Sequence, residues 1–310
     1  MSSSIPISNL SDSQNFIKNR STVTKLLQMC NLPKEITVLE IGPGKGIITQ
    51  QLCEIVNKVI AVEYDIKLAN SLREKLKDYS NLEIVNMDFL KYPLPTEKYI
   101  VVSNIPFNIT ADIINRLMEA SNTPEAIYFI MQKEAFYKHA GSPYCLECLK
   151  SIIIKPFYEA YKILDMRGED FYPVPHVDIV FASFIKRQYC DIKIGTPENY
   201  KDFIAYLFMA KGHTYKEKLK DLFSYEQIKR MRKQVKLEYD DKITTWGYES
   251  FLKLYKEFIN RVCDDKKQKI IGSYQKYKIR RTCRSIATLR IGACYPQLLH
   301  ERNATIRSMF

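Results

Sequence analysis

An apolar segment that runs into a glycine turn and then into a helix constrains the fold of this chain more than any other feature. Residues 37–41 read Thr-Val-Leu-Glu-Ile and predict a buried strand, which Gly42-Pro-Gly-Lys-Gly46 follows directly. Glycines let the backbone approach a ligand, and a helix N-terminus favours a negative group. Apolar residues then recur at helical spacing, at Ile48, Leu52, Ile55 and Val56. The segment predicts the opening of a doubly wound, nucleotide-binding α/β domain.

Further predicted strands end in polar residues that suit a nucleoside ligand. Residues 59–62 lead into Glu63, about twenty residues past the turn, where an acid can accept from ribose hydroxyls. Residues 82–85 lead to Asp88. The turn lacks the GxxxxGK[ST] spacing, which disfavours a nucleoside triphosphatase. These features alone fit a dinucleotide enzyme equally well. Additional strands are predicted at 125–131, 151–155 and 177–185.

The strand predicted at residues 99–102 leads into Ser103 and then Asn104-Ile105-Pro106-Phe107, which we call the clamp. Pro106 has no N–H and biases Ile105 away from the α region, so we expect an open backbone whose carbonyl groups face a cavity. The Asn104 side chain adds another carbonyl group, and Phe107 adds a flat apolar face. Together they are expected to hold a planar ring that carries an amino group. A purely structural role for Phe107 in the core is the alternative.

The chain is predicted to divide into an α/β domain over 1–188, a small α-helical domain over 189–264 and a flexible basic tail over 265–310. Apolar stripes at helical spacing after Tyr189 indicate the second domain. Its basic residues are candidates for an RNA-facing surface, and a solvated helix face is an equal alternative for any one of them. They are Lys211, Lys216, Lys218, Lys220, Lys229, Arg230, Arg232 and Lys233.

The net charge of +12 points to a polyanionic partner and lies mostly in the tail. Residues 265–310 hold 11 Lys and Arg against 2 Asp and Glu, a net of +9, which leaves +3 for residues 1–264. Tyr274 and Tyr277 interleave with the basic residues, a pattern suited to nonspecific nucleic-acid contact. A passive extension is the alternative.

Several classes of protein are disfavoured. The apolar runs are too short for a membrane span, and the N-terminus does not resemble a secretory signal. Of the eight cysteines only Cys145 and Cys148 form a CxxC, and without a second pair a zinc site is not expected. We expect a cytoplasmic monomer with free thiols, no metal site and no membrane partner.

Collinear segments spanning roughly residues 10–262 resemble the rRNA adenine N6-methyltransferases, the family of Erm-type macrolide-resistance enzymes and KsgA-type small-subunit dimethylases. Their order and spacing make the resemblance specific, although each segment alone is weak. The sequences Ser-Gln-Asn-Phe-Ile and Asn-Ile-Pro-Phe are closer to those of the Erm branch. The segments are Gln14-Asn-Phe-Ile17, Glu40-Ile-Gly-Pro-Gly-Lys-Gly46, Glu63, Asp88, Asn104-Ile-Pro-Phe107, Gln132-Lys-Glu134 and Phe171-Tyr-Pro-Val-Pro-His-Val-Asp178.

The resemblance implies a Rossmann-like methyltransferase domain that binds S-adenosylmethionine, followed by a small helical domain. Glu63 would take the ribose hydroxyls, Asp88 the adenine amine, and the glycine turn would pass the methionine end. Ile105 would add an apolar wall. The implied cofactor-binding residues are Asn15, Ile17, Gly42, Gly44, Glu63, Asp88, Phe89 and Asn104.

The implied reaction is methylation of the exocyclic N6 amine of an adenine in rRNA. The sulfonium methyl group is already activated, so the protein must mainly position the amine. Asn104 and a backbone carbonyl, of Ile105 or Pro106, would accept the amine hydrogens, and Phe107 would stack on the extruded base. The implied catalytic residues are Asn104, Pro106 and Phe107.

The leading prediction is methylation of protein-free 23S rRNA, or of an assembly precursor, that gives macrolide, lincosamide and streptogramin B resistance. The alternatives are a KsgA-type small-subunit dimethyltransferase in ribosome biogenesis and a non-catalytic RNA-binding or transcription factor on the same fold. Erm-type chains usually stop near the position of Arg261, so the resemblance implies nothing for residues 265–310. The target nucleotide and the number of methyl groups stay open.

Overall fold

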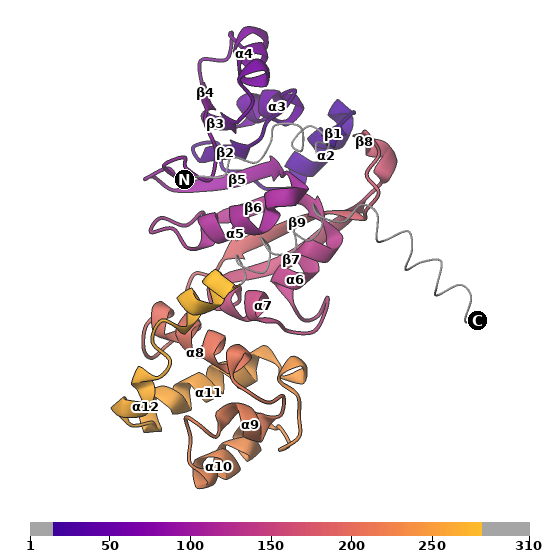
Figure 1. Cartoon of the computed structure of the whole chain (residues 1–310). Coiled ribbons are helices and arrows are strands. Elements are labelled where there is room, and N and C mark those ends of the chain that lie inside the picture. Colours follow the sequence, from indigo (N-terminus) through magenta and orange to yellow (C-terminus); the bar gives the residue numbers. More distant parts are fainter. Residues whose placement is uncertain (1–14, 281–310) are drawn as a thin grey trace, which may run out of the picture. The chain divides into compact units, whose positions relative to one another are not determined.

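The computed structural model describes residues 15–280, and the chain divides into two compact units, Met1–Asp191 and Ile192–Phe310 (Figure 1). Each unit has its own core. The first carries the sheet and the second is helical. Which unit binds RNA stays a prediction.

The first unit is built on a seven-stranded sheet with the order β4-β3-β2-β5-β6-β9-β7. Its first five strands in that order run parallel, and β9 is antiparallel to both β6 and β7. The predicted Rossmann-like α/β fold is confirmed. The strands are β2 (Thr37–Ile41), β3 (Lys58–Glu63), β4 (Leu82–Asn86), β5 (Tyr99–Asn104), β6 (Ala126–Gln132), β7 (Tyr158–Met166) and β9 (Ile179–Lys186).

Helices cover both faces of this sheet, which explains why the central strands read as continuous apolar runs. Successive strand residues face opposite sides: Val38 joins the cluster formed with α2 and α3, and Leu39 joins the cluster formed with α5 and α6. The helices are α2 (Arg20–Met29), α3 (Ile47–Ile55), α4 (Ile66–Lys75), α5 (Thr110–Met118), α6 (Lys133–Ala140) and α7 (Leu149–Ile154), with short 3-10 turns η1 (Phe107–Ile109) and η2 (Gly168–Asp170).

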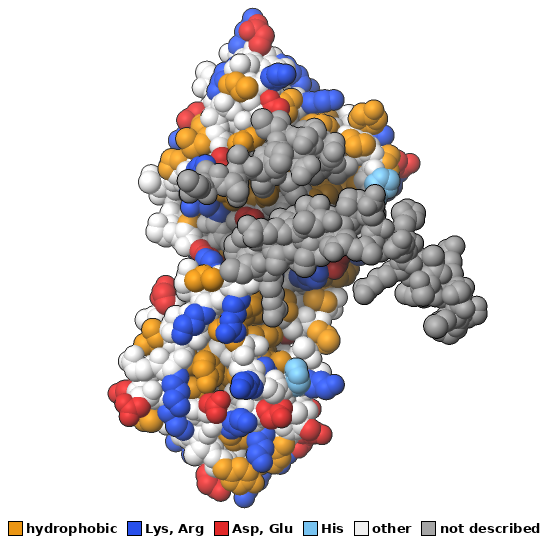
Figure 2. Space-filling view, viewed as in Figure 1, with side chains coloured by type: hydrophobic (Ala, Val, Ile, Leu, Met, Phe, Trp, Pro, Cys, Tyr) orange, Lys and Arg blue, Asp and Glu red, His pale blue; other side chains and the backbone are white. Residues whose placement is uncertain are grey.

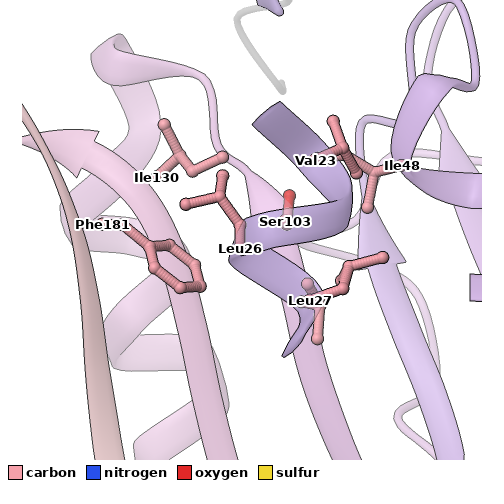
Figure 3. Close-up of a pocket in the computed structure, with 8 residues that line it drawn as sticks. Val23, Leu26, Leu27, Ile48, Ser103, Ile130 and Phe181 are labelled. Atoms are coloured by element: carbon pink, nitrogen blue, oxygen red, sulfur yellow. The ribbon is translucent and has the colours of Figure 1, made fainter. Parts of the chain in front are cut away.

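A small recess lies where α2 packs on the sheet. Figure 3 shows Leu26 of α2 directed toward Ile130 and Phe181, and the lining includes Ser103 of β5. All of the lining except Ser103 is apolar, and most of these residues belong to the core cluster beneath α2. The recess is therefore a packing feature of the core beneath α2.

The strand predicted at residues 151–155 is wrong, because this run lies in α7. Cys148 and Ser151 form a capping box at its start, and the run of isoleucines is buried against α6 and the sheet. A short apolar run gives no periodicity that separates a strand from a buried helix. The edge strand is instead β7, whose residues are mostly half-buried and mix polar with apolar side chains, so it gives no continuous apolar signal.

A separate two-stranded sheet joins residues that are far apart in sequence. β1 (Phe16–Ile17) pairs antiparallel with β8 (Phe171–Tyr172). The pairing brings the Asn-Phe-Ile residues 15–17 to the start of the proline-rich loop.

The second unit is a small helical bundle with an aromatic core. Tyr200, Phe203, Trp246, Phe251 and Phe258 are all buried. Helix starts are strongly specified, since Thr and Ser side chains cap α8, α9 and α10. The elements are α8 (Pro197–Met209), α9 (Tyr215–Leu219), α10 (Tyr225–Val235), η3 (Ile243–Thr245), α11 (Tyr248–Arg261) and α12 (Asp264–Gln268).

The predicted tail and basic surface differ from the structure in part. Residues 265–280 are not irregular: α12 continues to Gln268, and residues 273–280 are helical. The rest of that prediction, 281–310, lies outside the described residues. Lys218 is 4% exposed and donates from Nζ to the carbonyl oxygen of Ala210 at 2.7 Å, so it is a buried structural lysine and not a surface contact.

Within residues 15–280, no helix is both long enough and apolar enough to cross a membrane. Figure 2 shows Lys and Arg side chains spread over the visible face of the second unit, interspersed with acidic ones.

Candidate active site

The glycine turn after β2 has the left-handed backbone that its composition anticipates. Gly42 and Gly44 have φ angles of 63° and 57°, which residues with side chains rarely adopt. A Cβ atom on Gly44 would lie 2.6 Å from Cε1 of Phe16. Lys45 Nζ lies 5.1 Å from the centroid of the same ring. The turn thus presents bare backbone beside the N-terminal segment.

Glu63 ends β3 with its carboxylate directed at this turn. Oε2 accepts a hydrogen bond from the Gly44 N–H at 3.0 Å, and Oε1 accepts one from the Asp65 N–H at 3.0 Å. The residue is 3% exposed, and burial raises the pKa of its carboxyl group. A carboxylate has about four acceptor positions. Glu63 can therefore brace the turn and still accept from ligand hydroxyls.

Glu40, inside β2, belongs to the glycine motif, but no separate role was predicted for it. It is 2% exposed, and none of the described residues hydrogen-bonds to its Oε2. Burial, together with the charge of Glu63, raises the pKa of Glu40 to about 8. A buried carboxyl group with an unpartnered oxygen is costly to ionise, and a nearby cation lowers that cost. The one signal in the sequence was an acid within an apolar strand.

Asp88 and Phe89 follow the neighbouring strand end, that of β4. Asp88 is half-buried and Oδ1 accepts one local backbone N–H at 2.9 Å, whereas Phe89 is 5% exposed and belongs to the core. Asn86 donates from Nδ2 to the Glu63 carbonyl oxygen at 2.9 Å, which fixes the ends of β3 and β4 together. The sequence did not single out Asn86, because an Asn at a strand end resembles an ordinary turn residue.

Asn104 is anchored by one half of its amide. Its Nδ2 donates to the backbone carbonyl oxygen of Asn15 at 2.6 Å. Because a carbonyl oxygen only accepts, this bond defines which side of the amide is nitrogen. None of the described residues donates to Oδ1. The preceding Ser103 donates from Oγ to the carbonyl oxygen of Ile41, which ties β5 to β2 beneath the clamp.

The two backbone carbonyls considered for the amine are not equivalent. The Pro106 oxygen accepts from Thr110 Oγ1 at 3.3 Å and from the Ile109 N–H at 3.4 Å, which closes the turn into α5. Ile105 uses its N–H on the Ile130 carbonyl oxygen at 3.2 Å, but none of the described residues donates to its own carbonyl oxygen. The Ile105 oxygen is therefore the acceptor that the clamp leaves available.

Phe107 and Pro106 lie where the clamp adjoins the glycine turn. A Cβ atom on Gly42 would lie 3.9 Å from both Cγ and Cδ of Pro106. Phe107 is half-buried, with part of its ring packed on the core and part available to a ligand. The carboxyl ends of parallel strands share one edge of the sheet, which is where ligands bind in open α/β folds.

The N-terminal segment completes this edge. Ile17 is 5% exposed and lies opposite Phe171 in the two-stranded sheet, while Asn15 reaches Asn104. The structure brings predicted site residues together in three places: Asn15 is hydrogen-bonded to Asn104, Gly44 is hydrogen-bonded to Glu63, and Gly42 lies close to Pro106. Asp88 and Phe89 are placed at this edge by β4, which they follow, and Ile17 by β1, to which it belongs. In residues 15–280 no three His, Cys, Asp or Glu side chains gather as a metal site.

The groups at this edge of the sheet fit the cationic nucleoside cofactor that the family resemblance implies. A bare glycine turn accommodates a close approach, Glu63 and Asp88 offer acceptors to hydroxyl and amine groups, and the recessed Glu40 favours positive charge.

Comparison with known proteins gives a consistent result. The family model described as ribosomal RNA adenine dimethylase matches residues 7–260. A Fusobacterium nucleatum protein named ribosomal RNA small subunit methyltransferase A is 28% identical over 264 residues, covering 80% of this chain and 96% of that protein. A Bacteroides fragilis protein named rRNA adenine N-6-methyltransferase is 28% identical over 254 residues, covering 80% and 93%. The crystal structure of the 23S rRNA methyltransferase ErmE matches with a TM-score of 0.72 and 27% identity, covering 80% of this chain and 100% of that one.

Proposed function

Because the chain belongs to the ribosomal RNA adenine dimethylase family, we propose that it methylates the N6 amine of an adenine in large-subunit rRNA. Family membership by itself makes the chain an S-adenosylmethionine-dependent rRNA adenine methyltransferase. Similarity to the whole of a solved 23S rRNA methyltransferase supports the large-subunit assignment. The Asn-Ile-Pro-Phe sequence of the clamp supports the same branch.

The observation that carries this proposal is the pair of available acceptors at the clamp. Asn104 Oδ1 and the Ile105 carbonyl oxygen have no donor among the described residues, while Asn15 holds the Asn104 amide in place. An adenine N6 amine carries two hydrogens and no charge, so it needs two acceptors. The clamp offers that number, and it offers no positive charge that would repel an electrophilic methyl group.

The same acceptors explain how an aromatic amine becomes a nucleophile. Its lone pair is delocalised into the purine ring, which leaves the nitrogen planar and weakly nucleophilic. Accepting both hydrogens on one side favours a more tetrahedral nitrogen with its lone pair toward the methyl donor. Bound cofactor supplies an activated methyl group on a sulfonium centre, so alignment is the main task of the protein.

The remaining predicted residues divide between cofactor and base. Glu63 accepts the ribose hydroxyls, Asp88 accepts the cofactor's adenine amine, and the backbone of the glycine turn passes the amino-acid end. Phe107, half-buried at the clamp, offers a face for stacking the extruded target base. Cofactor-wall roles are proposed for Ile17, Phe89 and Ile105, and closure of the pocket for Asn15.

Transfer of labelled methyl groups to purified, protein-free large- and small-subunit rRNA tests the assignment. We expect label in the large-subunit RNA, in an adenine that nuclease digestion yields as N6-methylated adenosine. Label confined to the small subunit would reassign the chain to the other branch of the family. Label in neither RNA would contradict both.

The similarity to a small-subunit methyltransferase over 80% of this chain favours the second candidate, small-subunit dimethylation in ribosome assembly. The two candidates differ in a cellular readout as well. Expression in a macrolide-susceptible bacterium raises the inhibitory concentrations of macrolides, lincosamides and streptogramin B under the large-subunit proposal. Under the small-subunit alternative it instead complements a strain that lacks its own small-subunit dimethylase.

A further inference from the structure

The chain continues in ordered form beyond the part that the family model matches. That match ends at residue 260, and α11 ends at Arg261. Residues 262–280, which we call the extension, then form α12 and a helix over 273–280. Val262, Ile270 and Ser273 are between 2% and 5% exposed, so the extension is packed onto the second unit. It is an added structural element whose role the family does not supply.

Asp202 of α8 fixes the start of the second extension helix. Its Oδ2 accepts from the Gly272 N–H at 2.8 Å, and its Oδ1 accepts from the Tyr274 N–H at 2.8 Å. Gly272 has a φ of 74°, which turns the chain sharply into the helix. The first N–H groups of a helix have no partner inside it, so a carboxylate from another helix satisfies them and complements the helix dipole.

A second contact defines the direction of this helix. Arg280 Nη1 lies 4.0 Å from Met209 Sδ, near the end of α8. Asp202 and Met209 are separated by about 10 Å along α8, and Gly272 and Arg280 by about 12 Å along the extension, at roughly 1.5 Å per residue. The two helices therefore run side by side in the same direction, anchored at both ends.

The charged side chains of this helix are all positive. Residues 273–280 contain Lys276, Lys278 and Arg280 and no acidic residue. Lys276 and Arg280 are exposed and four residues apart, an arrangement in which like charges repel on a helix face. Lys278 is held 5.5 Å from the Tyr274 ring centroid. Close like charges of this kind are stabilised by a polyanion.

We propose that the extension is an accessory RNA-binding helix of this enzyme, with Lys276, Lys278 and Arg280 contacting phosphates and Asp202 acting as its positioning residue. The choice of RNA rests on the family's rRNA substrate, because a methyltransferase of rRNA meets that polyanion in every turnover. Contact with phosphates is independent of sequence, which suits an element outside the catalytic unit. Lys211, two residues beyond Met209 in the chain, is also exposed.

The test compares the full-length wild-type protein with three variants. One replaces Lys276, Lys278 and Arg280 by glutamine. A second is Asp202→Ala. The third, a control matched in charge, replaces exposed Lys34, Lys77 and Lys98 of the first unit by glutamine. Fluorescence anisotropy measures the affinity for a labelled rRNA hairpin over a series of KCl concentrations, and hydrogen exchange of residues 272–280 reports whether the helix stays docked.

The slope of log affinity against log salt is the decisive quantity. Each lost phosphate contact reduces the magnitude of this negative slope by about 0.7 to 0.9. The triple variant is therefore expected to have a slope smaller in magnitude by roughly 2 to 3. Its affinity for the hairpin should fall tenfold or more near about 0.15 M salt. Asp202→Ala is expected to speed exchange of 272–280 and to lose part of the same slope. The control is expected to change the slope less than the triple variant.

Three outcomes overturn the inference or a part of it. A wild-type slope in the triple variant means that the helix does not contact RNA. An equal loss in the control means that only net charge matters. Faster exchange with an unchanged slope in Asp202→Ala removes the positioning role. Failure of the proposed function is recognised separately, because then even the wild-type protein transfers no methyl group to large-subunit rRNA, whatever the salt slopes are.

Discussion

Replacing Asn104 by alanine should separate the chemical role of the clamp from its structural role. Among residues 15–280 the wild-type side chain makes one hydrogen bond, from Nδ2 to the Asn15 carbonyl oxygen, and it is only half-buried. Loss of such a bond costs about 0.5 to 1.5 kcal/mol of unfolding free energy, since water reaches the freed carbonyl. The fold and cofactor affinity should therefore change little.

The effect on turnover should be much larger. Alanine removes Oδ1, one of the two acceptors proposed to align the amine in the transition state. Removing one preorganised group of this kind typically costs about 2.7 to 4 kcal/mol, or on the order of 10² to 10³ in kcat. The expected signature is thus a large fall in kcat with a small change in the Kd for S-adenosylmethionine.

Single-turnover methyl transfer to rRNA, calorimetric titration of the cofactor and urea unfolding measure these three quantities. Asn104→Asp is the matched variant, because it keeps an acceptor but loses the Nδ2 donor and sets a carboxylate against the Asn15 carbonyl. It should lose anchoring and acquire a pH dependence. The reasoning is refuted if Asn104→Ala turns over like the wild type, or if its lost activity is explained wholly by lost cofactor binding.

Other predictions follow from the glycine turn, the buried acid and the buried lysine. Gly44→Ala places a methyl group 2.6 Å from the Phe16 ring at a φ of 57°. It should therefore lower the free energy of unfolding by about 1 to 2 kcal/mol or more and weaken cofactor binding, which urea unfolding and calorimetry measure. Unchanged cofactor affinity would contradict a close approach of the cofactor to this turn. Burial raises the pKa of Glu40 to about 8, so the folded state binds that proton more tightly than the unfolded state does. Wild-type stability should therefore fall relative to Glu40→Gln as pH rises from about 4.5 to 8, by roughly 3 to 5 kcal/mol, and parallel curves for the two proteins would show that Glu40 ionises freely. Lys218→Met should leave the salt dependence of RNA binding unchanged, because this lysine is buried on the Ala210 carbonyl; a shallower salt slope would return it to the surface.

Much of this molecule was readable from local pattern. The strand, glycine turn and helix at residues 37–56 specify their own geometry, because left-handed glycines and an apolar period need no distant partner. The ends of β3 and β5 were likewise predicted, since Glu63 and Asn104 each close an apolar run. The strand predicted at 151–155 was wrong because the helical state of this run depends on the Cys148 cap and on burial against neighbouring elements. The extension was predicted to be part of a flexible tail because its helix depends on Asp202, about 70 residues away in the sequence.

The sequence by itself determined which groups stand at the ends of the strands, since side-chain chemistry and strand periodicity are local properties. Only the tertiary structure decided which of those groups stay available. Asn15 occupies the nitrogen of Asn104, and Thr110 occupies the carbonyl of Pro106, which leaves Asn104 Oδ1 and the Ile105 oxygen without a donor among residues 15–280. Which donors and acceptors are already used depends on the residues that lie next to them in space, and the fold decides which residues those are.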